Sequence, residues 1–143
     1  MMKVGLIGLG RMGANMARRL RRGGIEVVAF NRNVEVTRAL AAESGVAVAT
    51  GLADLIAQLS APRVVWLMLP AGDVTGQHLD QLAPLLTRGD LVVDGANSYY
   101  KDSMRRAAAL AAKGLQFVDA GVSGGVGGLD NGYALMLGGE AAA

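Results

Sequence analysis

The sequence contains no cysteine, which excludes a disulfide framework and any chemistry that depends on a thiolate. It has a single histidine, His78, and no cluster of metal-ligating residues, so we expect no metal site. Aromatic residues make up only 4% of the chain, and a hydrophobic core must therefore be aliphatic and rich in alanine. Apolar runs stay shorter than the roughly 18 residues that a membrane-spanning helix needs, and no cleavable signal precedes them. These absences favour a cytoplasmic protein without a membrane partner.

Excess charge is also small, because the formal net charge is only +2. Four arginines do gather in one segment, at Arg18, Arg19, Arg21 and Arg22. Such a cluster is typical either of a nucleic-acid patch or of the solvated face of a helix. No aromatic residues interleave with these arginines and the rest of the chain is balanced, which favours the solvated helix face. We therefore expect no nucleic-acid partner.

The chain does have a regular alternation of short apolar runs and amphipathic segments. Its 143 residues suffice for one ordinary domain, and 52% hydrophobic residues can supply the core. Uninterrupted alternation of this kind predicts right-handed βαβ units and a doubly wound parallel sheet covered on both faces, an α/β fold of the Rossmann type. Strands are expected at residues 3–9, 26–31, 46–49, 63–69, 90–95, 115–120 and 133–139, and helices at residues 11–24, 34–45, 52–59, 73–86 and 99–114.

A glycine-rich segment, "GLGRMG" at residues 8–13, follows the first expected strand and opens the first expected helix. The G-x-G-x-x-G pattern is weak by itself, but at this position it is typical of a dinucleotide-binding loop. Gly8 would permit the tight turn, Gly10 the approach of a pyrophosphate, and Gly13 the packing of helix against strand. The phosphates would face unpaired N–H groups at the positive end of the helix. The alternative is that residues 8–13 form a plain strand-to-helix turn. We favour the dinucleotide-binding loop and therefore interpret residues 1–143 as a dinucleotide-binding domain.

The end of the second expected strand, "FNRN" at residues 30–33, bears on the choice of dinucleotide. A cofactor with a free ribose hydroxyl requires Asp or Glu about 20 residues after the glycines. Arg32 occupies this region instead, and no carboxylate lies between Glu26 and Glu35. An arginine can make charge-assisted hydrogen bonds to a 2′-phosphate, so the sequence favours NADP over NAD. The alternative for Arg32 is a solvated loop residue.

The stretch "DAGVSGGVGG" at residues 119–128 contains G-x-S-x-G around Ser123, a pattern found at the nucleophile of serine hydrolases. That nucleophile needs a helix immediately after the serine and a histidine later in the chain. The segment after Ser123 is not expected to be helical, and His78 precedes it. The hydrolase hypothesis therefore fails. The loop follows the sixth expected strand, where it could hold a substrate carboxylate or hydroxyl, or be merely flexible.

Four stretches together resemble the N-terminal domain of the decarboxylating 6-phosphogluconate dehydrogenases, within the wider β-hydroxyacid dehydrogenase family. They are "GLIGLGRMGANMARRL", "FNRN", "DGANSYYKDSMRRAAAL" and "GLQFVDAGVSGGVGGLDNGYALMLGG", and the resemblance covers essentially the whole chain. "DGANSYY" favours this branch over enzymes of the 3-hydroxyisobutyrate type. Ala96 stands where glycine is usual and Pro70 where many long-chain members have lysine, which suggests the shorter branch of the family.

The resemblance implies NADP- or NAD-linked oxidation of 6-phosphogluconate, a sugar-acid phosphate, followed by loss of carbon dioxide to leave ribulose 5-phosphate. It also implies a role for each matching position. By this resemblance the pyrophosphate would be held by Gly8, Leu9, Gly10, Arg11, Met12 and Gly13, and the adenosine ribose would be contacted by Asn31, Arg32 and Asn33. The rest of the cofactor would contact Leu69, Pro70 and Ala71, and Asn97 would lie between nicotinamide and substrate. The sugar acid would contact Ser123, Gly124 and Gly125.

In that family the general-base lysine and its acid partner lie in a second, all-helical domain, which we expect to be absent here together with the last crossover of the sheet. We therefore expect no catalytic residue in this chain, and full-length members to be homo-oligomers. Lys101 and Lys113 lie on an expected helix, where solvated charges are ordinary. Two hypotheses remain: a truncated piece of a dehydrogenase, or a module that binds a nucleotide or a partner without catalysis.

Overall fold

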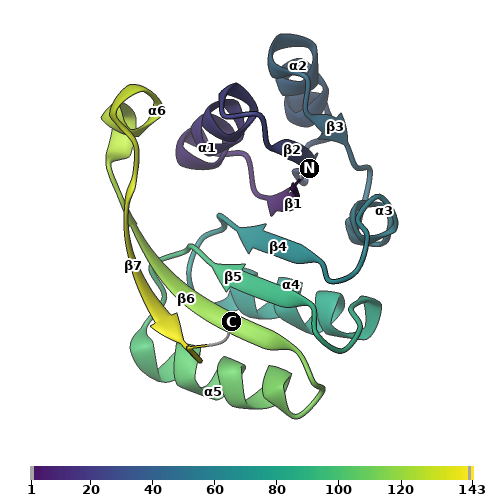
Figure 1. Cartoon of the computed structure of the whole chain (residues 1–143), viewed down its shortest axis with the longest axis vertical. Helices are drawn as coiled ribbons and strands as arrows, with labels where there is room; N and C mark the ends of the chain where they lie inside the picture. Colours follow the sequence, from purple (N-terminus) through teal and green to yellow (C-terminus); the bar gives the residue numbers. More distant parts are fainter. Residues whose placement is uncertain (1, 142) are drawn as a thin grey trace.

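The computed structural model describes residues 2–141 and residue 143, which form an α/β sandwich around one sheet (Figure 1). In this described part, seven strands are ordered β3-β2-β1-β4-β5-β6-β7. The strands are β1 (Lys3–Ile7), β2 (Glu26–Phe30), β3 (Ala47–Val48), β4 (Val64–Leu67), β5 (Leu91–Asp94), β6 (Gln116–Ser123) and β7 (Ala134–Gly139). The α-helices are α1 (Arg11–Arg22), α2 (Val34–Ser44), α3 (Leu52–Ala57), α4 (Asp73–Leu82), α5 (Tyr100–Ala111) and α6 (Gly128–Asn131), with 3₁₀ turns η1 (Ala83–Leu85) and η2 (Gly125–Gly127).

The strand order confirms the predicted doubly wound fold and corrects it at one edge. Strands β1 to β6 are parallel. Successive strands are added on one side of β1 as far as β3 and on its other side from β4 onward, so that the order of strands reverses between β1 and β4. Strand β7 instead pairs antiparallel with β6, from Val118 opposite Gly139 to Ser123 opposite Ala134. A short connection can join only antiparallel neighbours, because a parallel partner requires a long crossover. The 10 residues between β6 and β7 therefore dictate this direction.

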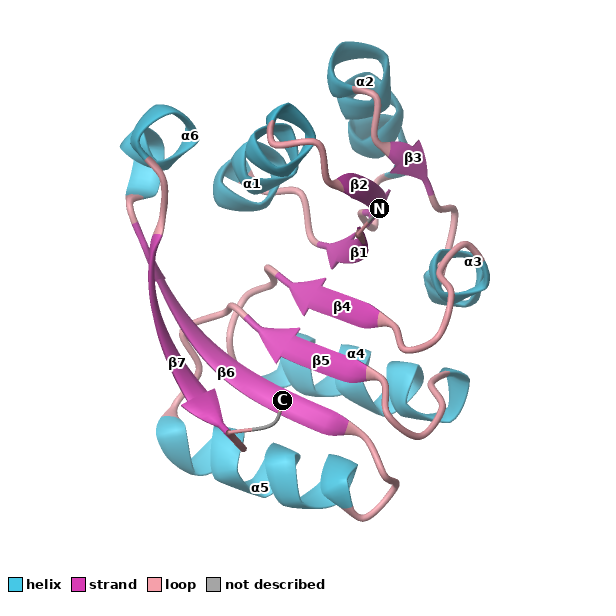
Figure 2. Ribbon diagram, in the orientation of Figure 1, coloured by secondary structure: helices cyan, strands magenta, loops and turns pink. Residues whose placement is uncertain are grey.

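Helices cover the two faces of the sheet in separate groups (Figure 2). Neighbouring residues of β1 point to opposite faces, as the two-residue period of a strand requires. Leu6 belongs to the same buried cluster as Ala17 of α1, whereas Ile7 belongs to a cluster with Leu79 of α4 and Leu110 of α5. The aliphatic core expected from the composition is thus divided into two layers, with α1 and α2 on one face and α3, α4 and α5 on the other.

On the α1 face, an apolar groove of about 570 Å³ runs between α1 and the start of β7. Its floor is formed by side chains of β4 and β5, among them Val64, Trp66, Leu91 and Val93. No helix in the described part of the chain lies over this floor beyond α1 itself. This face of β4 and β5 is therefore less covered than the face against α4 and α5.

The connection between β6 and β7 folds back onto α1 (Figure 1). Arg19 donates hydrogen bonds to the carbonyl oxygens of Leu129 (3.2 Å) and Asp130 (3.4 Å), and Arg22 lies 3.6 Å from the Asp130 carboxylate. The prediction that no helix follows Ser123 was wrong, because η2 and α6 form there. Contacts with α1 stabilise these short helical turns where glycine-rich sequence disfavours them. The helix α6 still does not begin at Ser123, as a hydrolase nucleophile would require.

The helix predicted over residues 73–86 ends early. Helix α4 stops at Leu82 and continues only as the 3₁₀ turn η1. Pro84 explains the change, because its ring clashes with the preceding turn of an α-helix and it has no N–H to donate. Along the same helix, His78 is bonded through Nδ1 to the Val74 carbonyl oxygen at 2.7 Å and lies away from the ends of the strands.

Candidate cofactor and substrate site

The predicted site residues converge on one edge of the sheet. Residues 8–13 follow β1, residues 31–33 follow β2, residues 69–71 follow β4, Asn97 follows β5, and residues 123–125 close β6. Because β1, β2, β4, β5 and β6 are parallel, these segments all lie at the carboxyl edge. The order of strands reverses between β1 and β4, and ligands of open α/β sheets bind in the crevice outside such a switch point.

The glycine-rich turn after β1 is packed against the neighbouring strand. Gly8 has φ +96°, a conformation that favours glycine, and a Cβ there would meet the carbonyl group of Met68. A Cβ on Gly13 would meet the carbonyl oxygen of Gly8. These two glycines therefore allow α1 to approach β1 and β4, in agreement with the roles expected from the sequence.

Gly10 differs from both. Its φ is −64° and its ψ −175°, which any residue can adopt, and a Cβ there would meet no heavy atom within 4 Å. The space in front of Gly10 is open at the N-terminus of α1, where no side chain caps the helix and the first turn contains no acidic residue. The backbone N–H groups of this turn therefore present a positive end toward the crevice.

The side chains of the segment after β2 form hydrogen bonds within the fold that were not expected from the sequence. The Asn31 side chain accepts a hydrogen bond from the Leu9 backbone N–H at 3.0 Å and donates one to the Asn33 carbonyl at 3.3 Å. Asn33 caps α2 by accepting from the Glu35 N–H at 3.1 Å. Asn31 thus braces the glycine turn against the β2 end. Arg32 is exposed between them, and no other described residue forms a hydrogen bond or ion pair with it.

Asn97 is held in a strained conformation at the end of β5. Its φ is +55°, the one positive φ of a non-glycine residue in the described chain. Its Oδ1 accepts a hydrogen bond from the Val122 backbone N–H of β6 at 3.1 Å. Only the oxygen of the amide can accept from an N–H, so the NH₂ group occupies the other side and is available as a donor. Strain that the surrounding structure maintains is typical of functional positions.

The segment expected to contact the substrate, residues 123–125, is partly strand. Ser123 was predicted in a loop, but it is the last residue of β6, where its backbone pairs with Ala134 of β7. This pairing extends β6 beyond the predicted end at residue 120. Ser123, Gly124 and Gly125 are exposed at the edge, and a Cβ on Gly125 would meet no atom within 4 Å. The segment is therefore open to solvent at Ser123 and Gly125, whereas a Cβ on Gly124 would meet Gly132 and Tyr133.

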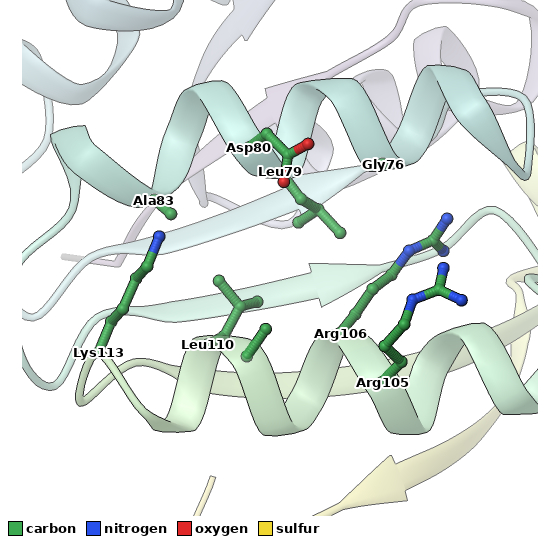
Figure 3. Close-up of a pocket in the computed structure, with 9 residues that line it drawn as sticks. Gly76, Leu79, Asp80, Ala83, Arg105, Arg106, Leu110 and Lys113 are labelled. Atoms are coloured by element: carbon green, nitrogen blue, oxygen red, sulfur yellow. The ribbon is translucent and has the colours of Figure 1, made fainter.

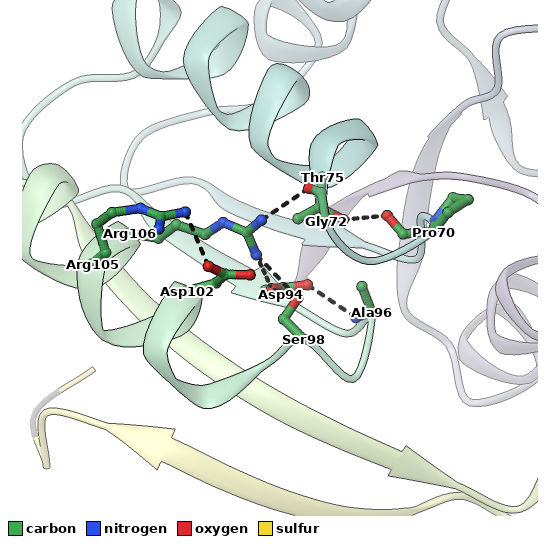
Figure 4. Close-up of polar contacts among 9 residues, drawn as sticks. All are labelled: Pro70, Gly72, Thr75, Asp94, Ala96, Ser98, Asp102, Arg105 and Arg106. Carbon is green, nitrogen blue, oxygen red and sulfur yellow. Dashed lines mark hydrogen bonds and ion pairs between the residues drawn. The ribbon is translucent and has the colours of Figure 1, made fainter.

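A buried charge cluster lies behind the loops after β4 and β5 (Figure 4). Asp94 is fully buried and accepts from the Ala96 N–H (2.9 Å) and from the Ser98 hydroxyl (2.6 Å). Arg106 of α5 lies 3.4 Å from the Asp94 carboxylate and donates to the Gly72 carbonyl at 2.9 Å. The sequence analysis missed this cluster, and its only sequence signal was a carboxylate closing the apolar run of residues 91–93.

Asp119 of β6 lies beside Asp94 of β5 in the sheet. Burial raises the pKa of the Asp119 carboxyl group, the charge of Asp94 raises it further, and Arg106 opposes the change. An acid whose pKa rises on folding disfavours the fold when ionised, and this penalty disappears once the pH falls below its ordinary pKa of 3.8. We expect Asp119→Asn to raise the unfolding temperature at pH 7 and to change it little near pH 3. Thermal unfolding at the two pH values checks this, and a larger gain at acid pH would contradict it.

Neither Lys101 nor Lys113 forms a side-chain hydrogen bond or ion pair with another described residue. Lys101 is exposed on α5, 6.0 Å from the ring centre of Tyr100. Lys113 was predicted on a helix but follows α5 in a turn before β6, at the opposite edge of the sheet. It lines a groove of about 290 Å³ between α4 and α5, where Figure 3 shows Lys113 at one end and Arg106 at the other.

The fold and its carboxyl edge agree with comparisons to known proteins. Residues 3–143 match the profile of a family described as the NAD binding domain of 6-phosphogluconate dehydrogenase. The chain belongs to this family. Among the described residues, no helix combines the length and apolar character required to cross a membrane, and no group of three or more candidate ligands could hold a metal ion.

Relatives of the chain include the NAD(+)-dependent, decarboxylating 6-phosphogluconate dehydrogenase of Haloferax volcanii, which is 45% identical over 96% of the chain and 45% of the relative. The decarboxylating enzyme of Treponema pallidum is 44% identical over 98% of the chain and 30% of the relative. Among solved structures, the Plasmodium falciparum 6-phosphogluconate dehydrogenase, studied with NADP+ and with its substrate 6-phosphogluconate, has a TM-score of 0.91 at 30% identity, covering 97% of this chain and 31% of that one.

A Mycobacterium tuberculosis 3-hydroxyisobutyrate dehydrogenase is also similar, with a TM-score of 0.86 at 31% identity, covering 99% of this chain and 48% of that one. The chain thus spans less than half the length of each of these relatives. Sequence identity to the Haloferax volcanii and Treponema pallidum enzymes, 45% and 44%, is higher than the 31% to this 3-hydroxyisobutyrate dehydrogenase, which agrees with the branch favoured by "DGANSYY".

Proposed function

We propose that this chain is the nicotinamide-dinucleotide-binding part of a 6-phosphogluconate dehydrogenase and supplies one wall of its substrate site. The observation that carries the proposal is the open space at Gly10, directly before the uncapped N-terminus of α1 and beside the switch point of the sheet. A pyrophosphate there meets backbone N–H groups and no side chain. We propose residues 1–143 as one domain of the longer enzyme.

We further propose how the cofactor lies along the carboxyl edge. Residues 8–13 hold the pyrophosphate, residues 31–33 the adenosine ribose, and residues 69–71 the part of the cofactor beyond β4. Asn97 lies between nicotinamide and substrate, with its NH₂ group as donor. The cofactor supplies the hydride acceptor, and the chain orients it at this edge. Asn31 acts mainly through the turn, because both ends of its amide are already bonded within the fold.

The sugar acid is proposed to contact Ser123, Gly124 and Gly125. Ser123 donates or accepts a hydrogen bond and is no nucleophile, since no α-helix begins at Ser123 as the hydrolase arrangement requires. We extend the proposal to oxidative decarboxylation of 6-phosphogluconate in the cytoplasmic pentose phosphate pathway by a homo-oligomeric full-length enzyme. The 3-hydroxyisobutyrate dehydrogenase relative supports the alternative of another β-hydroxyacid substrate, and competition between the two acids for the chain loaded with cofactor distinguishes them.

NADP is the proposed cofactor, on the evidence of Arg32. Its guanidinium group is exposed beside the adenosine-ribose segment, and no carboxylate follows β2 until Glu35. Glu35 itself pairs with Arg38 on α2. The Plasmodium falciparum relative was studied with NADP+, whereas the Haloferax volcanii relative is named as NAD(+)-dependent, so a direct measurement decides the choice.

Replacing Arg32 with alanine should weaken NADP binding by about 1.5–3 kcal/mol, the range of hydrogen bonds to charged groups, and should change NAD binding little. Calorimetric titration of the wild-type chain and the variant with both cofactors measures the difference. Arg88→Ala removes another exposed arginine, which forms no ion pair among the described residues and lies before β5 at the opposite edge of the sheet, and serves as the control, with both affinities unchanged. Equal losses for NADP and NAD would refute a contact with the 2′-phosphate.

A further inference from the structure

One arginine joins two loops of the proposed site from behind. The Arg106 guanidinium contacts the loop after β4 through the Gly72 carbonyl oxygen (2.9 Å) and the loop after β5 through the Ser98 hydroxyl (3.1 Å) and the Asp94 carboxylate (3.4 Å). It is only 8% exposed and lies on the interior side of both loops (Figure 4). Its planar fork of N–H donors suits such a bridge, whereas a lysine carries a single point charge.

Each loop has a second anchor. The Pro70 carbonyl oxygen accepts a hydrogen bond from Thr75, a fully buried side chain of α4, at 2.8 Å. Asn97 lies between Ala96 and Ser98, and both of these residues donate to Asp94. With its Oδ1 fixed by Val122, Asn97 can relax from its positive φ only if this cluster loosens. The separation of the two loops and the direction of the Asn97 amide thus depend on the same buried ion pair.

We propose that Arg106 is a positioning residue, which sets the loop after β4 and Asn97 at the spacing that receives the nicotinamide half of the dinucleotide. This inference rests on the proposed function. The adenosine half lies at residues 8–13 and 31–33, which have no hydrogen bond to Arg106 or Asp94. Loss of the bridge therefore weakens the binding of the whole dinucleotide and leaves the binding of its adenosine half intact.

The chain provides a matched control at the other edge of the sheet. Arg63, directly before β4, lies 3.1 Å from the carboxylate of Asp90, directly before β5. Asp90 is fully buried, as Asp94 is, and accepts hydrogen bonds from the N–H groups of Arg63 and Thr87. Each ion pair holds a buried aspartate at one end of β5, but Arg63 adjoins β4 whereas Arg106 belongs to α5, and only the pair of Arg106 lies at the carboxyl edge.

The experiment compares wild-type chain, Arg106→Lys and Arg63→Lys by titration with NADPH and with 2′,5′-ADP, together with thermal unfolding. In Arg106→Lys we expect NADPH affinity to fall by about tenfold or more, because misplaced contacts lose their value steeply with distance. We expect 2′,5′-ADP affinity to stay within about twofold, as for independent distant sites. Arg63→Lys should leave both affinities within the same limit.

A second variant, Ser98→Ala, removes one bridging contact without leaving a charge unpaired, and should show the same selective loss in weaker form. This variant tests the inference even if Arg106→Lys does not fold. Equal losses of both ligands, or no loss of either, would overturn the role of Arg106. A wild-type chain that binds neither NADPH nor 2′,5′-ADP would overturn the proposed function itself, and the two failures are thus distinguished.

Discussion

Gly10→Val is expected to reduce NADPH affinity at least 100-fold, about 2.7 kcal/mol, while the domain stays folded. The valine side chain would occupy the open space where the pyrophosphate is proposed to lie. The backbone at Gly10 suits valine, because φ −64° with ψ −175° is ordinary extended conformation. Loss of a glycine helix cap costs about 1 kcal/mol, so the unfolding temperature should fall by no more than about 4 °C. Calorimetry and thermal unfolding measure the two effects.

Gly13→Val is the control that separates binding from packing. Its Cβ would meet the carbonyl oxygen of Gly8, so that α1 could no longer dock on β1. We expect this variant to lose its fold and its binding together, whereas Gly10→Val loses binding alone. Unchanged affinity in folded Gly10→Val would show that the glycine turn does not hold the pyrophosphate.

The 143-residue chain should not oxidise 6-phosphogluconate measurably, even with saturating NADP. Hydride leaves an alcohol carbon only as the hydroxyl proton is removed, and the proposed substrate contacts Asn97 and Ser123 supply an amide and a hydroxyl, neither of which is a base at neutral pH. Asp94 is buried and paired with Arg106. Absence of a base typically removes a factor of about 10²–10⁴, and incomplete orientation of the reactants leaves up to roughly 7–11 kcal/mol of barrier in place.

NADPH absorbance tests this expectation directly. The positive control is a chimaera in which this chain replaces the matching 45% of the Haloferax volcanii relative, and it should turn over. Ser123→Ala in the chimaera should weaken turnover without abolishing it, since a hydrogen bond to substrate is lost and no nucleophile is. Robust turnover by the short chain would place a base within these residues and contradict the assignment of roles given above.

Most of the fold could be predicted from local patterns in the sequence. Apolar runs and glycine stops predicted the strands and helices because period and turn chemistry act over a few residues. The glycine turn at residues 8–13 was predictable for the same reason. The direction of β7 was missed, because the expected sixth strand ended at residue 120 and left 12 residues before residue 133, about the length of a parallel crossover, whereas β6 continues to Ser123.

The hydrogen bonds and ion pairs that hold the loops of the candidate site in place could not be predicted from the sequence. Asn31 was assigned to the ribose, yet its side chain bonds the backbone of Leu9, a partner 22 positions away. The contact between Arg106 and Gly72 spans 34 positions and arises only when α4 and α5 pack side by side. Such pairs leave no periodic signal, because each depends on the tertiary packing of several elements. The residues proposed to face the ligand thus lie in sequence motifs, whereas the residues that hold them in place do not.

Trp66 is the only tryptophan of the chain, and it lies half-buried on β4 beside the apolar groove, with its indole N–H donating to the Met68 sulfur at 3.2 Å. The same strand leads to residues 69–71 at the carboxyl edge. A single tryptophan fluorophore at this position reports on two events, one through the intensity of its emission and the other through the emission wavelength. Reduced dinucleotide bound at the edge absorbs its emission and lowers the intensity, whereas apolar material covering the groove shifts the emission to shorter wavelength. One fluorescence spectrum therefore distinguishes occupation of the edge from coverage of the face.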